Sequence, residues 1–342
     1  MNAEELKLLR LQNQFLLCGG SADEVVSGLV GLQAQYGANA LHALHIRTGG
    51  GEAEQRRYVK TWTLRGTLHL HAVRDLPLVL YRGSETEFGQ MAFTHPDVNT
   101  ASSERFRTLI LDALKQGGRT RGELKALCDA QGMTQVESEI VFHAWGGLFR
   151  AMAEHGEIAY SSGGNREFVR LEPFEPMEEH AALTELMRRY VTHYGPVTLR
   201  DAQTFFGMPQ KTIAPYLAAA ATERCTLGKR EYYAANTALA ADAAVPSVVF
   251  LAGFDPLLLG YRKTENPFLP EGLVKRVYNN TGIVFPAVLL HGRVAAIWKR
   301  TPKGVLITPL GQIGVRDKKK IERKAGADFA DAVVRWAGAP EY

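Results

Sequence analysis

The sequence has few cysteines and no long hydrophobic run. Its three cysteines, Cys18, Cys128 and Cys225, lie about a hundred residues apart in a chain of 342 residues. Because they form no CxxC pair and no short cluster with histidine, the sequence supports neither a zinc ribbon nor a disulfide framework. No apolar stretch approaches the roughly 18–20 residues that a membrane-spanning helix needs. The polar residues 1–10 do not resemble a signal peptide, so we expect a cytoplasmic protein.

The composition is that of an ordinary globular protein. Hydrophobic residues make up 46% of the chain and charged residues 22%, and the mean hydropathy is −0.15. These values exclude a disordered or fibrous chain. At roughly 150 residues per domain, the length predicts two or three domains.

The net charge of +4 is distributed unevenly along the chain. Residues 1–100 carry a net charge of −1 and residues 101–200 one of −2, whereas residues 201–342 carry +7. Within 262–324, fourteen Lys and Arg residues stand against four Asp and Glu residues. A local excess of this size favours a polyanionic partner such as nucleic acid, with a solvated basic surface as the alternative.

One order of helices recurs three times in the first 242 residues. In each copy, a helix with an apolar stripe ends near a glycine, and a capping sequence opens the next helix at Ser21, Thr120 or Thr198. In the second copy a third helix opens at Thr134, and its apolar side chains share one face: Val141, Trp145, Leu148 and Met152.

Strand-like runs follow the helices of the second and third copies. A glycine-rich turn at 161–165 separates two such runs, and a second pair turns at Gly228 and Lys229. Helix, capped helix, third helix and β-hairpin is the order of a winged helix-turn-helix. A generic helical repeat is the alternative, but such repeats need no hairpin.

From about residue 245 onward, short β-rich runs are separated by Gly, Pro and Asn. These runs are Val248–Leu251, Val274–Val277, Ile283–Val284, Ala287–Leu290, Val294–Trp298 and Val305–Thr308. We predict a small, mostly antiparallel and barrel-like domain with a closing helix over Asp328–Trp336. The predicted fold class is therefore α+β, with three tandem winged helices and a C-terminal β-rich domain. The predicted boundaries are 1–98, 99–176, 177–242 and 243–342.

Two glutamines in the segment 31–37 (GLQAQYG) are the first candidates for chemistry. Gln33 and Gln35 flank the small residue Ala34. On a regular α-helix, side chains two residues apart project about 200° apart, whereas in an extended segment they share a side. If both glutamines serve one site, the segment must depart from regular helix, and the flanking glycines permit this. A polar helix end that faces solvent is the alternative.

A second polar pattern covers residues 61–71 (TWTLRGTLHLH). It alternates like a single strand, with Gly66 as a bulge or a point of close approach. By parity four polar side chains share one face: Arg65, Thr67, His69 and His71. This face offers donors suited to phosphate or a base edge, with the solvated face of a wing as the alternative. The sequence contains no P-loop, no HExxH and no GxSxG motif.

Three segments, in their order along the chain, resemble the AlkZ/YcaQ family of bacterial winged-helix DNA glycosylases. They are the Gln33-Ala34-Gln35 tripeptide, Thr61–His69 (TWTLRGTLH) and Leu251–Tyr261 (LAGFDPLLLGY). The resemblance implies that the chain unhooks interstrand crosslinks with a Gln-Φ-Gln catalytic motif. It also implies a basic DNA channel built from tandem winged helices, a β-hairpin that probes the lesion, and no metal or cofactor. The sequence has Ala34 at the middle position, which is smaller than the aliphatic residue often found there.

The resemblance and the charge pattern together suggest roles for individual residues. Gln33 and Gln35 are expected to position a water molecule and contact the deoxyribose, while His69, with Arg65 and Thr67, holds the DNA backbone beside the lesion. Basic residues of the C-terminal part are expected to line the duplex: Arg262, Lys263, Lys275, Arg276, Lys299 and Arg300. We expect a monomer that acts in the nucleoid on double-stranded DNA with alkylated or crosslinked guanine.

Two other functions remain open from the sequence. A non-catalytic winged-helix regulator would bind DNA without excision, although regulators usually dimerise on paired half-sites. A winged-helix array that binds a protein partner would show no salt-dependent affinity for DNA.

Overall fold

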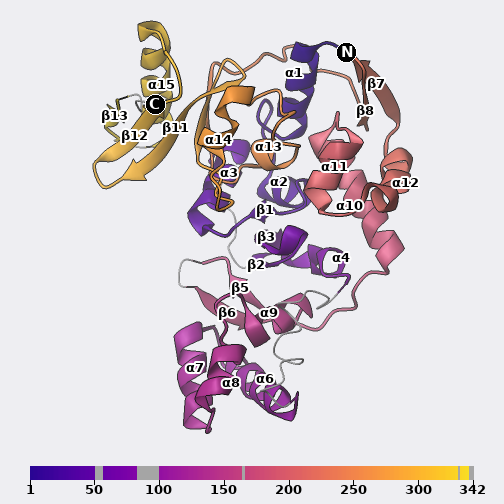
Figure 1. Cartoon of the computed structure of the whole chain (residues 1–342), viewed down its shortest axis with the longest axis vertical. Helices are drawn as coiled ribbons and strands as arrows, with labels where there is room; N and C mark the ends of the chain where they lie inside the picture. The colour runs from indigo at the N-terminus through magenta and orange to yellow at the C-terminus, as the bar shows by residue number, and fades with distance from the viewer. Residues whose placement is uncertain (51–56, 83–99, 164–165, 330–331, 339–342) are drawn as a thin grey trace. The chain divides into compact units, whose positions relative to one another are not determined.

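The computed structural model has a mixed α+β fold, as the sequence predicts (Figure 1). It describes residues 1–50, 57–82, 100–163, 166–329 and 332–338. The chain divides into two compact units: the first joins Met1–Glu52 to Met187–Tyr342, and the second is Ala53–Leu186. Among the described residues, no helix is long and apolar enough to cross a membrane.

The N-terminal part of the first unit is helical except at one short strand. Its elements are α1 (Ala3–Asn13), α2 (Ala22–Gly28), β1 (Leu32–Gln33) and α3 (Gly37–Thr48). After α10 (Glu179–Tyr194), which contains the boundary between the units, the first unit continues with helices and a hairpin. These elements are α11 (Leu199–Phe206), α12 (Gln210–Ala220), β7 (Glu223–Leu227) and β8 (Arg230–Ala234). The hairpin turns at Gly228 and Lys229, as predicted.

Four predicted helix starts are confirmed by their capping geometry. The side chains of Ser21, Thr120, Thr134 and Thr198 each accept a hydrogen bond from the backbone N–H three residues on. The carboxylate at that third position accepts the N–H of the cap residue in return. Because this reciprocal pairing satisfies two helix-end donors locally, it can be read from four consecutive residues.

The C-terminal part of the first unit is an open sheet covered by a helix. The strands are β9 (Val248–Leu251), β10 (Ala287–Leu290), β11 (Arg293–Thr301), β12 (Gly304–Pro309) and β13 (Val334–Trp336), and the helices are α13 (Pro256–Leu259), η4 (Glu271–Leu273), α14 (Val274–Val277) and α15 (Val315–Asp328). The strand order is β13-β12-β11-β10-β9. Neighbouring strands are antiparallel except for the parallel pair β12 and β13.

The predicted barrel closure is wrong for the described residues, because β9 and β13 form two separate edges of this sheet. Helix α15 packs against the sheet instead. Its buried Ile321 and Ala325 share one apolar cluster with Phe250, Trp298 and Phe329. Since the helix covers the apolar face, the sheet buries that face without curling into a barrel.

Two secondary-structure predictions in this region are also wrong. Val274–Val277 is the short helix α14 rather than a strand. Val277, three residues after Val274, is fully buried. The closing helix was predicted over Asp328–Trp336, but the C-terminal helix α15 already ends at Asp328. The last residues of the predicted range, Val334–Trp336, form strand β13. Tertiary packing overrides the propensity of such short apolar runs.

The second unit combines a sheet with a helical cluster. Its strands β2 (Tyr58–Trp62), β3 (Leu68–Ala72), β4 (Arg119–Thr120), β5 (Ile158–Ser161) and β6 (Glu167–Arg170) lie in the order β3-β2-β5-β6-β4. Its helices are η2 (Leu64–Gly66), η3 (Val73–Asp75), α4 (Leu76–Val79), α6 (Thr100–Leu114), α7 (Arg121–Ala130), α8 (Gln135–Val141) and α9 (Gly147–Glu154). The predicted turn at 161–165 lies partly outside the described residues. The number of winged-helix modules stays a prediction.

The predicted third helix of this unit is interrupted. It divides into α8 and α9 around residues 142–146, and Trp145, expected on the buried face, is 67% exposed. The break falls at Gly146 and Gly147, whose φ angles of 131° and 51° are incompatible with a right-handed helix. A side chain at Gly147 would also collide with the carbonyl oxygen of Ile140, 2.2 Å from an added Cβ.

Candidate functional site

The two candidate glutamines lie in a non-helical segment of the first unit. After α2, Val30 and Gly31 adopt left-handed φ angles of 57° and 84°, and these turn the chain out of the helix. Gln33 then ends the short strand β1, and helix α3 begins at Gly37. The segment departs from regular helix, which the sequence analysis requires if both glutamines serve one site.

Burial alternates along this segment. Ala34 is 3% exposed, whereas Gln33 is half-buried and Gln35 is exposed. In an extended segment, residues two apart share a side. Strand β1 ends at Gln33 and the chain bends at Gln35, so the buried Ala34 lies between two amide side chains that are both less buried than it is.

The same segment lies against the LAGFDPLLLGY motif, although more than two hundred residues separate them in the sequence. The ring of Tyr36 stacks on that of Phe254, with 5.9 Å between ring centroids and 22° between planes. Gly253 approaches Asn39 so closely that an added Cβ would lie 2.6 Å from its Nδ2. Both motifs were identified from the sequence, and the structure shows that they are in contact.

Tyr36 was not singled out from the sequence. It is 53% exposed and directly follows Gln35, so it presents part of an aromatic ring beside the glutamine pair. Its position next to the motif was the only signal that the sequence offered, because exposure of an aromatic residue depends on the tertiary fold.

Residues 61–71 form a hairpin, so the prediction of a single strand is wrong. Strands β2 and β3 pair antiparallel, and the chain reverses through the 3-10 turn Leu64–Gly66. Arg65 in this turn has a φ angle of 56°, and Gly66 has one of 65°. An added Cβ at Gly66 would lie 2.7 Å from Nη2 of Arg150, so the predicted close approach at Gly66 is confirmed.

The polar side chains of the hairpin differ in exposure. Arg65 is exposed and Thr67 is half-buried, with its hydroxyl donating to the carbonyl oxygen of Leu64 at 3.2 Å. His69 and His71 are only 2% and 1% exposed. The face of the hairpin that carries His69 and His71 is therefore buried rather than solvated.

The buried ring of His69 is neutral and is held in one tautomer. Its Nδ1 donates to the carbonyl oxygen of Thr67 at 3.0 Å, which leaves the lone pair on Nε2. Burial lowers the pKa of His69 well below its usual value of 6.5, and the positive charge of Arg65 lowers it further. At neutral pH the ring is neutral, so on this hairpin Arg65 supplies the positive charge and His69 a hydrogen-bond acceptor.

The six basic residues predicted to line a duplex all lie in the first unit. Arg262 and Lys263 follow α13, Lys275 and Arg276 lie on α14, and the other pair lies on β11: Lys299 and Arg300. All are exposed except Arg276, which is half-buried and donates to the carbonyl oxygen of Leu310 at 3.0 Å. Arg276 therefore also ties α14 to the end of β12.

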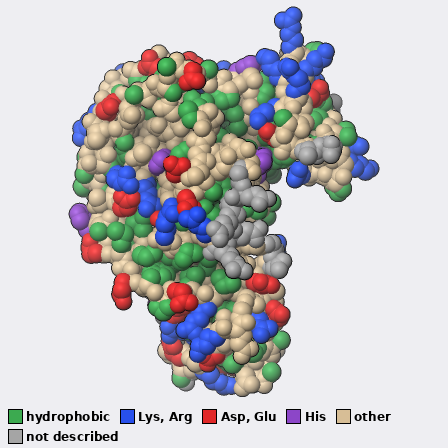
Figure 2. All heavy atoms as spheres, turned by 180° about the vertical axis from the view of Figure 1, so that it is seen from behind, with side chains coloured by type: hydrophobic (Ala, Val, Ile, Leu, Met, Phe, Trp, Pro, Cys, Tyr) green, Lys and Arg blue, Asp and Glu red, His purple; other side chains and the backbone are tan. Residues whose placement is uncertain are grey.

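Helix α15 adds a basic surface beside this sheet. Figure 2 shows Lys and Arg side chains gathered over the C-terminal sheet and α15. One open depression of about 760 Å³ is lined by charged residues of this helix: Arg316, Lys319, Lys320, Glu322 and Arg323. The basic stretch found in the sequence is thus in part a continuous helical face.

Metal ligands are not clustered in the part of the chain that the structure describes. No group of three or more His, Cys, Asp or Glu residues there is placed to hold a metal ion.

The chain is similar to proteins of known activity over most of its length. The family model described as DNA glycosylase AlkZ-like matches residues 26–332. The interstrand DNA cross-link repair glycosylase of Streptomyces sahachiroi is 24% identical over 345 aligned positions, which cover 92% of each protein. The solved structure of Streptomyces sahachiroi DNA glycosylase AlkZ matches with a TM-score of 0.76 and 21% identity, covering 98% of this chain and 100% of that chain.

Proposed function

The chain belongs to the family of AlkZ-like DNA glycosylases, and on that premise we propose that it excises N7-alkylguanine from duplex DNA and unhooks interstrand crosslinks. The named relative from Streptomyces sahachiroi is an interstrand cross-link repair glycosylase, which supports the choice of substrate. The observation that supports the proposal is that Gln33 and Gln35 flank the buried Ala34 in a non-helical segment, where neither glutamine is fully buried.

The reaction suits a site with two amides. Alkylation at N7 makes guanine cationic, so the base leaves with the electron pair of the C1′–N9 bond as that bond breaks. Water adds to C1′ of the oxocarbenium-like sugar and releases its proton to solvent, which leaves an abasic site. The developing charge is of the same kind as in glycoside hydrolysis.

Gln33 and Gln35 orient the water and contact the deoxyribose. An amide oxygen accepts a hydrogen bond from water but does not take its proton at neutral pH. The contribution of the pair is therefore orientation, which is a large part of such catalysis. Without a carboxylate at these two positions, activity is confined to activated, cationic adducts.

The hairpin residues hold the DNA backbone beside the lesion. Arg65 is exposed and carries the charge that attracts phosphate. His69 is buried and supports this turn from within, because its Nδ1 donates to the carbonyl oxygen of Thr67. Thr67 shapes the turn by bonding to Leu64. The exposed basic residues of the first unit provide the sequence-independent attraction to the duplex.

The covalent link between the two DNA strands of a crosslink restricts how the protein can recognise the lesion. Base flipping requires a few kcal/mol and a nucleotide that can rotate freely out of the stack. A crosslinked base cannot rotate in this way, so recognition takes place within or near the helix. The predicted winged-helix modules, monomeric state and location at the nucleoid belong to the same proposal.

Incubation with duplex DNA tests the function directly. The protein is added to a duplex that holds one N7-methylguanine, or a nitrogen-mustard crosslink, and the products are treated with alkali. Strand cleavage at the lesion reports an abasic product and supports the proposal. Tight, sequence-dependent binding without cleavage would instead identify a non-catalytic DNA-binding protein.

A further inference from the structure

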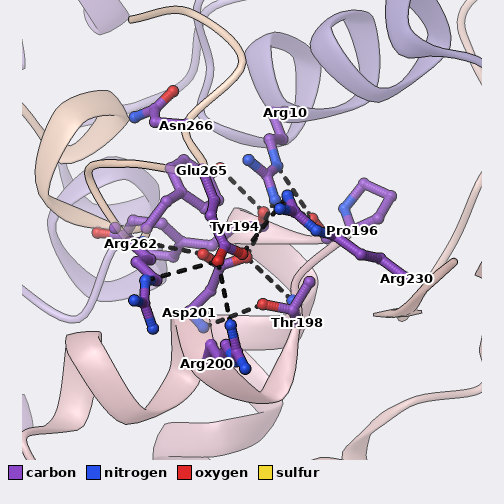
Figure 3. Close-up of polar contacts among 12 residues, drawn as sticks. Arg10, Tyr194, Pro196, Thr198, Arg200, Asp201, Arg230, Arg262, Glu265 and Asn266 are labelled. Carbon is purple, nitrogen blue, oxygen red and sulfur yellow. Dashed lines mark hydrogen bonds and ion pairs between the residues drawn. The ribbon is translucent and has the colours of Figure 1, made fainter. Parts of the chain in front are cut away.

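Three arginines of the first unit surround one glutamate (Figure 3). Oε1 of Glu265 lies 3.4 Å from Nη1 of Arg200 and 3.5 Å from Nε of Arg262. Its Oε2 lies 3.5 Å from Nη1 of Arg230. The arginines come from three separate segments: the first turn of α11, the start of β8 and the loop after α13.

The glutamate is enclosed while the arginines are open to solvent. The side chain of Glu265 is 13% exposed, whereas those of Arg200, Arg230 and Arg262 are 60%, 52% and 45% exposed. A guanidinium carries five N–H donors, and the ion pairs with Glu265 engage one nitrogen of each arginine. The cluster therefore presents guanidinium donors outward around an inner carboxylate.

The backbone beneath the arginines is fixed by a buried carboxylate. Asp201, which directly follows Arg200, is 2% exposed, and its Oδ1 accepts the backbone N–H of Arg262 at 2.9 Å. Its Oδ2 accepts the N–H of Thr198 at 3.0 Å and a hydrogen bond from Arg10 at 3.2 Å. One buried side chain thus sets the spacing between the segments that carry Arg200 and Arg262.

The loop that carries Glu265 is held in the same way. The N–H of Glu265 donates to the carbonyl oxygen of Arg262 at 2.9 Å, which closes a tight turn. The next residue, Asn266, is buried and donates to the carbonyl oxygen of Leu257 at 2.8 Å. Hydrogen bonds to buried side chains thus hold the backbone that carries Arg200, Arg262 and Glu265, which is what a preorganised binding site requires.

The charges of the cluster do not balance. Three guanidinium groups stand against one carboxylate, so repulsion among the arginines is only partly offset. The contacts of 3.4–3.5 Å to Glu265 are also longer than the 2.7–2.9 Å of strong charge-assisted hydrogen bonds. An anion on the outer side would restore the balance and provide shorter acceptors.

We propose that Arg200, Arg230 and Arg262 bind neighbouring phosphates of the DNA backbone, and that Glu265 is the positioning residue that holds them in register. The choice of DNA rests on the proposed function. The planar guanidinium matches phosphate oxygens in bidentate geometry, and half-exposed arginines on three segments suit an extended polyanion. Of these residues, only Arg262 stood out in the sequence, because the other three are distant from it along the chain or acidic.

The arginines are tested by the salt dependence of binding to an undamaged duplex. Affinity is measured by fluorescence anisotropy over a series of KCl concentrations for the full-length chain and an R200A/R230A double variant. The slope of log K against log[salt] should be smaller by about two units in the double variant, roughly one for each lost phosphate contact. Arg224→Ala is the matched control, because Arg224 lies on the same hairpin, is 56% exposed and pairs with Glu231 instead.

The outcomes separate this proposal from the proposed function. An unchanged slope in the double variant, or an equal loss in Arg224→Ala, overturns the arginine site even if the wild-type protein excises N7-methylguanine. A two-unit loss supports it even if no excision is seen. If inorganic phosphate raises the melting temperature of the wild-type protein but not of the double variant, while duplex binding is unchanged, the cluster is a small-anion site and the DNA assignment is wrong.

Glu265→Gln tests positioning against simple charge. The substitution raises the net charge of the cluster by one, so charge alone predicts tighter binding to duplex. If Glu265 holds the arginines in register, the variant binds more weakly and its salt slope falls, because the guanidinium groups spread apart. A merely structural role would lower the melting temperature and leave the slope unchanged, and tighter binding would overturn the positioning role.

Discussion

Arg47 and Asp255 form a fully buried, bidentate ion pair. Nη2 and Nη1 of Arg47 donate to the two carboxylate oxygens of Asp255 at 2.7 Å and 3.1 Å, and both side chains are 0% exposed. Arg47 lies in the last turn of α3, the helix that begins two residues after Gln35, and Asp255 caps α13 within LAGFDPLLLGY. The pair therefore joins α3, the helix that follows the glutamine segment, to the LAGFDPLLLGY motif.

Asp255→Asn should strongly destabilise the protein. The variant keeps the shape of the side chain but leaves the buried charge of Arg47 uncompensated, so the free energy of unfolding should fall by about 3–5 kcal/mol. Urea denaturation measures this loss. Glu179→Gln is the control, because the pair Arg82 and Glu179 is 41% and 56% exposed, and its loss should change stability by less than about 0.5 kcal/mol.

Gln33→Ala and Gln35→Ala should each reduce excision and leave the fold intact. Single-turnover excision of N7-methylguanine should fall by about 100-fold or more, the scale of one positioned catalytic group. Melting temperatures should stay near that of the wild type, because neither glutamine is fully buried. The exposed Gln116→Ala is the control. Excision at the wild-type rate in either variant would remove that glutamine from the mechanism.

Gln35→Asp should preserve or raise the excision rate. A carboxylate can accept the proton of the attacking water and favours an oxocarbenium-like transition state, whereas an amide supplies only a hydrogen bond. Repulsion from phosphate can weaken DNA binding, so the rate is measured on fully bound substrate. Complete loss of excision with folding and binding intact would mean that residue 35 does not face the water, and Gln33 alone would carry that role.

The predicted DNA-contacting residues should separate into two groups. Lys275→Ala, Lys299→Ala and Arg300→Ala should each lower the salt slope of duplex binding by about one unit, because these side chains are exposed. Arg276→Ala should lower stability more than the slope, because Arg276 is bonded to Leu310. Anisotropy and urea denaturation on the same samples test both effects. A flat salt response of the wild type would argue against nucleic acid as the partner.

Stability should fall as the pH falls below about 6.5. Burial lowers the pKa of His42, His69 and His193 in the folded protein, so below that pH the unfolded chain binds more protons than the folded one. The limiting slope is about 1.4 kcal/mol per pH unit for each histidine. Urea denaturation over a pH series measures it. His193→Gln should flatten the slope, and an equal flattening at the exposed control His180→Gln would contradict the assignment.

Some features of this protein follow from a few neighbouring residues, and these were correctly predicted from the sequence. The capping boxes at Ser21, Thr120, Thr134 and Thr198 depend on four consecutive residues each, so their helices start where expected. The departure of the glutamine segment from helix, which the sequence permitted through its flanking glycines, is equally local, since left-handed backbone at Val30 and Gly31 precedes it. The turn at 228–229 belongs to the same group.

Other features were decided only by contacts between distant segments. Periodicity did not distinguish the hairpin of β2 and β3 from one strand, or α14 from a strand, because short apolar runs fit both structures. Whether His69 is buried and neutral depends on what packs around it. The Arg47–Asp255 pair and the pairs of Arg200 and Arg230 with Glu265 join residues that no local pattern relates, because a folded chain places side chains by burial and charge rather than by their order in the sequence.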